Sequence, residues 1–180
     1  MALHEASGGL RVAVVLETER LILREAEDGD AAFVLELLNS PGFLENIGDR
    51  GVRSLDEASA FIEDRMRASY REHGFGMWIA DQKRDGSSVG MAGLVRRDGL
   101  DVPDVGYAFL QRAWGQGYAQ EAAGAVLAHA QGPLGIPQLA AITTLENFAS
   151  MAVLRKIGFT YRGVIQLPGI ERESTHFTCP

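Results

Sequence analysis

The chain has 180 residues, of which 46% are hydrophobic and 23% charged, a composition that fits one globular domain with a sizeable core. Its net charge of −7 disfavours a nucleic-acid partner, because an acidic surface repels phosphate groups. The single cysteine, Cys179, excludes an internal disulfide, and the four histidines share no metal-ligand spacing, so we expect no metal.

The N-terminal end carries no basic and apolar secretory signal, and no apolar run reaches the ~20 residues of a membrane span. We therefore expect a cytoplasmic protein without a membrane partner. Residues 1–15 are interpreted as a flexible leader or edge segment, and residues 16–180 as one domain. Residues 16–24 alternate apolar and polar side chains in their second half and predict the first strand.

Two helices are predicted next. Asp28 or Asp30 is placed to cap a helix with one apolar face, which residues 41–42, Pro-Gly, should end. Residues 54–57 form a capping-box pattern, with a serine followed three positions later by a glutamate. This pattern should open a second helix over about 54–71.

The rest of the chain alternates strands and helices. Asp85-Gly86 is a turn signal between two strands, and Gly158 suits the position after a helix. The predicted strands are residues 75–81, 88–96, 102–110, 138–145, 160–166 and 172–178, and the predicted helices are residues 118–130 and 148–157. This order indicates an α/β layered domain around a mixed sheet.

The strongest chemical signal lies in residues 105–122, where a strand enters a glycine-containing turn that opens a helix. Free N–H groups and the helix dipole favour an anion at a helix start, and Gly115 and Gly117 let the backbone approach it closely. The segment therefore predicts a phosphate or pyrophosphate cradle. It is neither a dinucleotide fingerprint nor a P-loop, because G-x-G-x-x-G and Gly-Lys-Ser/Thr are absent. The alternative is a strand-to-helix turn that merely needs positive φ.

Residues 112–117, Arg-Ala-Trp-Gly-Gln-Gly, match the Arg/Gln-x-x-Gly-x-Gly/Ala signature of the GNAT N-acetyltransferase superfamily. Residues 147–159 resemble its second motif, in which Asn is followed by Ser three positions on and then by Lys-x-Gly-Phe. Residues 18–24 and 167–169 resemble the branch of ribosomal-protein-alanine N-acetyltransferases. The resemblance extends over residues 16–178.

The resemblance implies a GNAT fold: a mixed, mostly antiparallel sheet of six to seven strands, flanked by about four helices, with a splayed central strand pair. It implies transfer of an acetyl group from acetyl-CoA to a primary amine by direct attack in a ternary complex, most of all to the N-terminal α-amine of a protein or peptide. The alternative acceptor is a small amine such as a polyamine, an amino acid or an aminoglycoside. The alternative of another class is a non-catalytic acyl-CoA-binding sensor domain. Some relatives form a homodimer through the C-terminal edge strand, and this chain ends on a comparable strand.

The resemblance also assigns site residues. Ser150 would lie near the leaving sulfur and supply a proton or hydrogen bond. The structural alternatives are a helix-capping role for Asn147, a packing role for Ser150 and a solvated position for Arg112. The residues expected to bind acetyl-CoA are Phe109, Leu110, Arg112, Trp114, Gly115, Gln116, Gly117, Tyr118 and Asn147.

The general base is less well marked. Only a neutral amine attacks a thioester, so a proton must leave the acceptor. The candidates are Asp104, on the strand that leads into the cradle, and Glu146, and the resemblance favours Asp104. The alternatives are a turn role for Asp104 and a reaction without a dedicated base. The acceptor itself should enter between residues 41–53 and 167–172.

Overall fold

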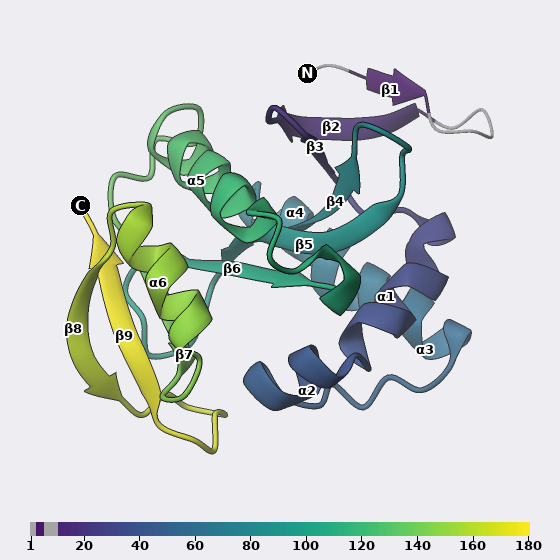
Figure 1. The fold of residues 1–180 in the computed structure, drawn as a ribbon. Helices are drawn as coiled ribbons and strands as arrows, with labels where there is room; N and C mark the ends of the chain where they lie inside the picture. Colours follow the sequence, from purple (N-terminus) through teal and green to yellow (C-terminus); the bar gives the residue numbers. More distant parts are fainter. Residues whose placement is uncertain (1–2, 6–10) are drawn as a thin grey trace.

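The computed structural model describes residues 3–5 and 11–180, and these form a twisted mixed sheet with helices on both faces (Figure 1). The nine strands of the described residues stand in the order β1-β2-β3-β4-β5-β6-β7-β9-β8. They are β1 (Leu3–Glu5), β2 (Arg11–Glu17), β3 (Leu21–Arg24), β4 (Met77–Gln82), β5 (Ser88–Val95), β6 (Asp104–Phe109), β7 (Leu139–Thr144), β8 (Thr160–Ile165) and β9 (Ser174–Cys179). Every neighbouring pair is antiparallel except β6–β7, so the predicted α/β class with a mostly antiparallel sheet is confirmed.

The N-terminal region differs from the prediction, and it accounts for the larger number of strands. Residues 16–24, expected to be one strand, belong to a hairpin of β2 and β3, in which the Leu21 N–H donates to Thr18 Oγ1 at 2.9 Å. The turn contains neither glycine nor proline, so it leaves no strong sequence signal. Residues 11–15 of the expected leader lie in β2. Residues 1–2 and 6–10 of that leader lie outside the described residues.

The helices also exceed the expected number. Pro41 opens a separate short helix instead of ending the first one, because proline is well tolerated at the first helical position. The predicted capping box is present, with Ser54 accepting from the Glu57 N–H. The helices are α1 (Ala31–Leu38), α2 (Pro41–Asn46), α3 (Leu55–Phe61), α4 (Ala68–His73), α5 (Tyr118–Gln131) and α6 (Phe148–Lys156), with 3-10 segments η1 (Asp28–Asp30) and η3 (Gln111–Ala113) and a π segment η2 (Ile62–Arg67). None of the helices described is both long and apolar enough to span a bilayer.

Two apolar cores cover the two faces of the sheet (Figure 1). Helices α5 and α6 pack on one face, where Ala122, Val126 and Leu154 are buried against strand residues such as Val105. Helices α1 to α3 and η2 pack on the other face through residues such as Leu37. The sheet is therefore the middle layer, and β6 has a helical layer on each side of it.

The sheet opens between β6 and β7. Along its other edge β6 pairs with β5 from Asp104 to Phe109, whereas its parallel pairing with β7 is limited to Asp104 opposite Ala140. Strand β7 continues instead with β9, which it pairs over its whole length. Beyond Asp104 the two central strands separate, which is the splayed pair that the sequence predicts.

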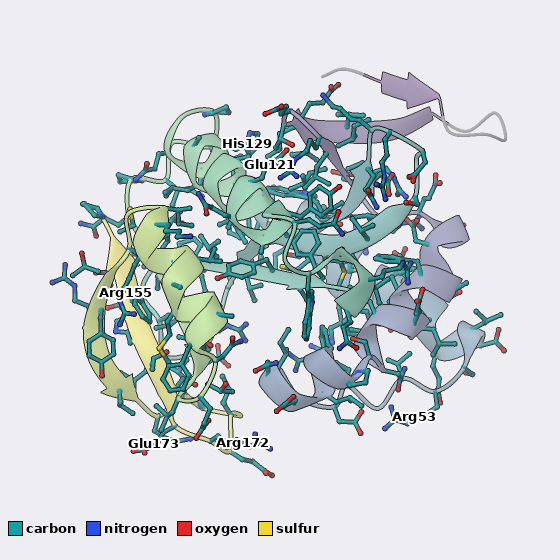
Figure 2. All side chains as sticks on the ribbon, in the orientation of Figure 1. Arg53, Glu121, His129, Arg155, Arg172 and Glu173 are labelled. Carbon is teal, nitrogen blue, oxygen red and sulfur yellow. The ribbon has the colours of Figure 1, made fainter. Side chains whose placement is uncertain are left out.

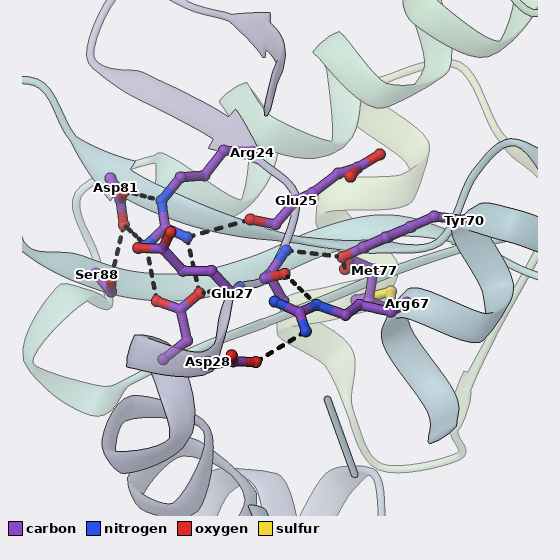
Figure 3. A network of polar contacts seen from close by, with 11 residues as sticks. Arg24, Glu25, Glu27, Asp28, Arg67, Tyr70, Met77, Asp81 and Ser88 are labelled. Carbon is purple, nitrogen blue, oxygen red and sulfur yellow. Dashed lines mark hydrogen bonds and ion pairs between the residues drawn. The ribbon is translucent and has the colours of Figure 1, made fainter. Parts of the chain in front are cut away.

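A buried ionic network joins the start of α1 to the sheet (Figure 3). Arg24 on β3 donates two hydrogen bonds of 2.8 Å to Asp30 and one of 2.6 Å to Asp81 on β4. Ser88 Oγ donates to the second oxygen of Asp81 at 2.6 Å. Burial opposes the charge on Arg24, but hydrogen bonds and the charges of both aspartates raise its pKa overall. The network fixes α1 against the end of the sheet that carries β3 and β4.

Candidate active site

The backbone of β6 offers hydrogen-bonding groups to the gap. The Leu110 N–H donates to the Val89 carbonyl on β5 at 2.9 Å, and backbone groups alternate sides along a strand. The N–H and C=O groups of Tyr107 and Phe109 therefore face β7 across the gap. The Leu110 carbonyl accepts from the Ala113 N–H at 2.8 Å, so both backbone groups of Leu110 have protein partners. The Leu110 N–H is therefore not free for a ligand, whereas the N–H and C=O groups of Tyr107 face the gap.

The gap leads to the start of α5. Strand β6 continues through η3 into a loop whose Gly115 and Gly117 have φ of 72° and 81°, the left-handed region that favours glycine. Gly117 is the N-cap of the 14-residue helix α5, whose first N–H groups have no intrahelical partner. A Cβ at Gly115 would meet no atom within 4 Å, so φ rather than space requires glycine there. The loop and helix start have the geometry of an anion cradle.

Arg20 brings a positive charge to this cradle, and sequence reasoning missed it. Its Nη1 donates to the Gln116 carbonyl at 2.8 Å, and its other nitrogens contact Glu121 on α5 at 2.7 and 2.6 Å. Its guanidinium also lies 4.6 Å from the centre of the Tyr118 ring. The side chain is still 42% exposed, so the cation faces solvent beside the helix start. No local pattern connects Arg20 with residues about a hundred positions away.

Two residues of the signature turn away from the helix start. Arg112 forms an ion pair with Glu36 on α1. Trp114 donates its indole N–H to the Phe109 carbonyl at 2.7 Å, and its ring lies against Gly42 on α2. Both side chains therefore tie the loop to the α1–α2 layer. An open cavity of about 340 Å³ next to them is lined by Glu36, Asn39, Ser40, Pro41, Leu110, Gln111 and Arg112.

Three side chains meet on the α6 side of the gap. Asn147 caps α6, because its Oδ1 accepts from the Ser150 N–H at 3.1 Å. The Ser150 hydroxyl lies 2.7 Å from the hydroxyl of Tyr107 on β6. Burial raises the pKa of Tyr107 to about 12; the Ser150 hydrogen bond opposes this shift and the charge of Asp104 adds to it. Tyr107 was missed from the sequence, since nothing local distinguishes it from other strand tyrosines.

Asp104 lies where β6 and β7 begin to separate, and its side chain is only 1% exposed. The Arg97 Nε donates to Oδ2, whereas Oδ1 has no hydrogen-bond partner among the described residues. The Ile142 backbone N–H also favours the carboxylate and acts to lower the pKa of Asp104. Burial outweighs these contacts and raises the pKa of Asp104 from its usual 3.8 to about 6. A carboxylate in this state is suited to accept a proton near neutral pH.

Asp104 and Ser150 approach the gap from opposite faces of the sheet. Side chains alternate along a strand, so Asp104 shares a face with Ala108, which packs against the α1–α3 layer. Tyr107 and Phe109 share the other face, under α5 and α6. The two candidate catalytic side chains therefore lie on different sides of the sheet.

The face of Asp104 is rich in arginine. Burial of the Arg50 guanidinium, together with the nearby charges of Arg97 and Arg65, lowers the pKa of Arg50. Arg50 lies in the loop that follows α2, the same loop that carries Arg53, which Figure 2 labels at the molecular surface. Figure 2 places Arg172 and Glu173 in the β8–β9 connection, the other segment expected near the acceptor. Glu146, the second base candidate, is exposed before α6.

Comparison with known proteins agrees with this geometry. The model of the acetyltransferase (GNAT) domain matches residues 20–160. The chain belongs to the GNAT acetyltransferase family. It is 34% identical over 154 residues to the uncharacterized protein YkkB of Bacillus subtilis, a match that covers 84% of this chain and 88% of YkkB.

Solved structures show the same GNAT fold. An acetyltransferase from Agrobacterium tumefaciens superposes with a TM-score of 0.77 at 23% identity, and 98% of each chain is covered. RimL, a ribosomal L7/L12 α-N-protein acetyltransferase, superposes with a TM-score of 0.81 at 18% identity over 99% of each chain. At these identities the likeness concerns the fold alone. With the family shown, this GNAT protein is an N-acetyltransferase, and the enzyme class predicted from its sequence is confirmed.

The GNAT signature residues fall into separate groups. Gly115, Gly117 and the backbone of Phe109 lie along one path from the gap to the helix start, and Asn147 and Ser150 lie across the gap from β6. Arg112 instead pairs with α1. Within the described residues no group of three His, Cys, Asp or Glu side chains has the arrangement of a metal site.

Proposed function

We propose that this protein binds acetyl-CoA along the β6–β7 gap and transfers its acetyl group to the N-terminal α-amine of a protein or peptide. The observation that carries the proposal is the splayed strand pair, which ends on the cradle at α5 and has Asp104 on one face and Ser150 on the other. Acetyl-CoA is a long, bent ligand with phosphates at one end and a thioester at the other. The gap and the cradle offer matching chemistry in that order.

The residues fit the cofactor. The N–H groups at Gly117 and the first turn of α5 would hold the pyrophosphate, and Arg20 would add charge next to them. The N–H and C=O groups of Tyr107 and the N–H of Phe109 would bond the pantetheine amides as an added strand does, whereas the Phe109 carbonyl already accepts from Trp114. Asn147 uses its Oδ1 as a helix cap, which leaves its amide N–H₂ for the pantetheine arm. Arg112 would reach phosphate only by leaving Glu36, so we assign it no direct role.

The two faces of the sheet would serve different steps of the transfer. The amine would approach from the α1–α3 face and pass its proton through water to Asp104 Oδ1, which is buried and has no hydrogen-bond partner among the described residues. Attack on the thioester carbon places negative charge on the carbonyl oxygen, which a backbone N–H facing the gap would stabilise. The C–S bond then breaks towards the α6 face, where the Ser150 hydroxyl is placed to hydrogen-bond the departing sulfur.

The charges on the α1–α3 face of the sheet, where the amine would approach, indicate which class of acceptor fits best. Arg50, Arg65 and Arg97 gather on the side of Asp104, and within the described part of the chain only Arg97 of the three pairs with a carboxylate. A polyamine would bring several positive charges against these arginines, which is electrostatically unfavourable. A single α-amine on a neutral or acidic peptide is compatible with them. This observation supports a peptide N-terminus over a polycationic small amine.

The test is thermal stability with and without acetyl-CoA, followed by release of free CoA across peptides, amino acids, polyamines and aminoglycosides. Specific binding raises Tm by mass action, and saturation at about 100 times Kd adds about 2.7 kcal/mol. We expect a Tm shift and turnover that is faster with neutral or acidic peptide N-termini than with polyamines. Binding without any turnover would favour an acyl-CoA sensor, and no shift would refute the proposal.

A further inference from the structure

The Tyr107–Ser150 contact has features that the proposed transfer does not use. The two hydroxyl oxygens are 2.7 Å apart, and the Tyr107 hydroxyl can also donate to the Ser150 carbonyl at 3.2 Å, a longer contact. The Ser150 N–H is already bonded to Asn147. The position of Ser150 is thus set by α6 and its cap, while the direction of its hydroxyl hydrogen depends on Tyr107 alone among the described residues.

The chemistry of the two hydroxyls decides which one donates. A phenol is a far stronger acid than an aliphatic alcohol and is the better donor. Burial keeps Tyr107 protonated, with a pKa of about 12, so its proton is present throughout the working pH range. When the phenol donates to Ser150 Oγ, the hydrogen of Ser150 itself is left without a partner. That hydrogen must then point away from Tyr107.

We propose that Tyr107 is a positioning residue, which donates to Ser150 Oγ and so turns the Ser150 hydroxyl hydrogen towards the leaving sulfur. The inference rests on the proposed function, since it needs the thioester in the β6–β7 gap. It gives the Tyr107 side chain a role in addition to the cofactor contacts proposed for the backbone of β6.

The pair stabilises the leaving group by hydrogen bonding and does not supply the proton. The amine nitrogen forms its bond to the carbonyl carbon, the C–S bond breaks, and its electron pair stays on sulfur. Transfer of the Ser150 proton to sulfur would require the Tyr107 proton to move to Ser150, leaving a phenolate. A thiol has a pKa near 8.5, several units below that of Tyr107, so this transfer is unfavourable. The thiolate leaves hydrogen-bonded, and the amine proton goes to Asp104 or water.

The experiment titrates the thiol of bound CoA through the ultraviolet absorbance of its thiolate, in the native protein and in Tyr107→Phe, Ser150→Ala and the double variant. A hydrogen bond to a charged group is worth about 1.5–3 kcal/mol, so we expect the thiol pKa to rise by about 1–2 units in Tyr107→Phe. The same loss should lower kcat about 10- to 100-fold while the KM for acetyl-CoA changes less than about 2-fold. Tyr70→Phe is the matched control, because Tyr70 is a largely buried tyrosine whose hydroxyl bonds the Met77 carbonyl away from the gap.

The double variant separates positioning from an independent role. If Tyr107 acts through Ser150, Tyr107→Phe should add almost nothing once Ser150 is alanine. Equal thiol pKa values in the native protein and Tyr107→Phe, or effects of the two substitutions that multiply, would overturn the inference while leaving the proposed function intact. Failure of the native protein to bind CoA at all would refute the proposed function and the inference with it.

Discussion

The substitution Asp104→Asn tests the burial of the candidate base through stability as well as activity. Asp104 is 1% exposed, and burial raises its pKa from 3.8 to about 6. Each pKa unit corresponds to about 1.4 kcal/mol, so holding this carboxylate ionised in the fold costs about 3 kcal/mol. Asparagine has nearly the same shape and no charge to desolvate.

The sign of the pH dependence follows from the raised pKa. Well below pH 3.8, Asp104 is protonated in both folded and unfolded chains, and its contribution to stability is fully present. Between about pH 4 and 6 the unfolded chain ionises first, so the native protein loses stability as pH rises. Relative to Asp104→Asn, we expect the free energy of unfolding of the native protein to fall by about 2 kcal/mol from pH 4 to pH 7. The Arg97 ion pair forms in the native protein only as Asp104 ionises, and its favourable effect is already contained in the folded-state pKa of about 6.

The assay is urea unfolding of both proteins at a series of pH values, together with kcat/KM for the best acceptor. The variant should lose about 10²–10⁴-fold in kcat/KM, the usual contribution of a general base, while the native profile rises through an ionisation near pH 6. A stability difference that does not change between pH 4 and 7 would show that Asp104 is not buried as an ion. Unchanged activity in the variant would remove it as the base.

Three further substitutions test the cradle, the cap and the buried network. Arg20→Gln removes a charge beside the start of α5, so the Kd for CoA measured by calorimetry should rise about 3- to 10-fold. An unaltered Kd would restrict Arg20 to a structural role. Asn147→Asp should keep the cap of α6 and the Tm of the protein, but it removes the amide donor and should raise the KM for acetyl-CoA. Asn147→Ala should raise this KM as well and also cost about 1 kcal/mol of stability. If Asn147→Asp and the native protein have equal KM values, Asn147 does not contact the cofactor. Asp81→Asn leaves part of the Arg24 charge unpaired, so the free energy of unfolding measured in urea should fall by about 3 kcal/mol (Figure 3). A decrease below about 1 kcal/mol would contradict this account.

Features made by neighbouring residues could be predicted from the sequence. The capping box at Ser54 and Glu57 closes within three residues, and it is present as expected. The two glycines of the cradle have the positive φ that such a turn needs. The β2–β3 turn and helix α2 were missed, because a threonine-closed turn and a proline at the first helical position give weak or ambiguous signals.

The candidate active site shows the same contrast between local patterns, which the sequence reveals, and contacts between distant residues, which it does not. Motif spacing located Ser150 and Asn147, but the contact between Ser150 and Tyr107 joins positions 43 residues apart. Arg20 and Glu121 meet across 101 positions. The ion pair of Arg112 with Glu36 likewise joins residues that only the fold brings near each other. No pattern in one sequence encodes such pairs.

The sequence by itself determined most of the strands and helices from residue 75 onward, because hydrophobic periodicity, capping and glycine conformation act over a few residues, and its two motifs indicated the family. Only the tertiary structure decided which face of the sheet each candidate group occupies and what surrounds it. Asp104 is the clearest case. Its position next to the cradle strand is visible in the sequence, but its raised pKa comes from desolvation by residues distant in the chain. Desolvation is a property of the packed interior, and it arises only when the chain has folded.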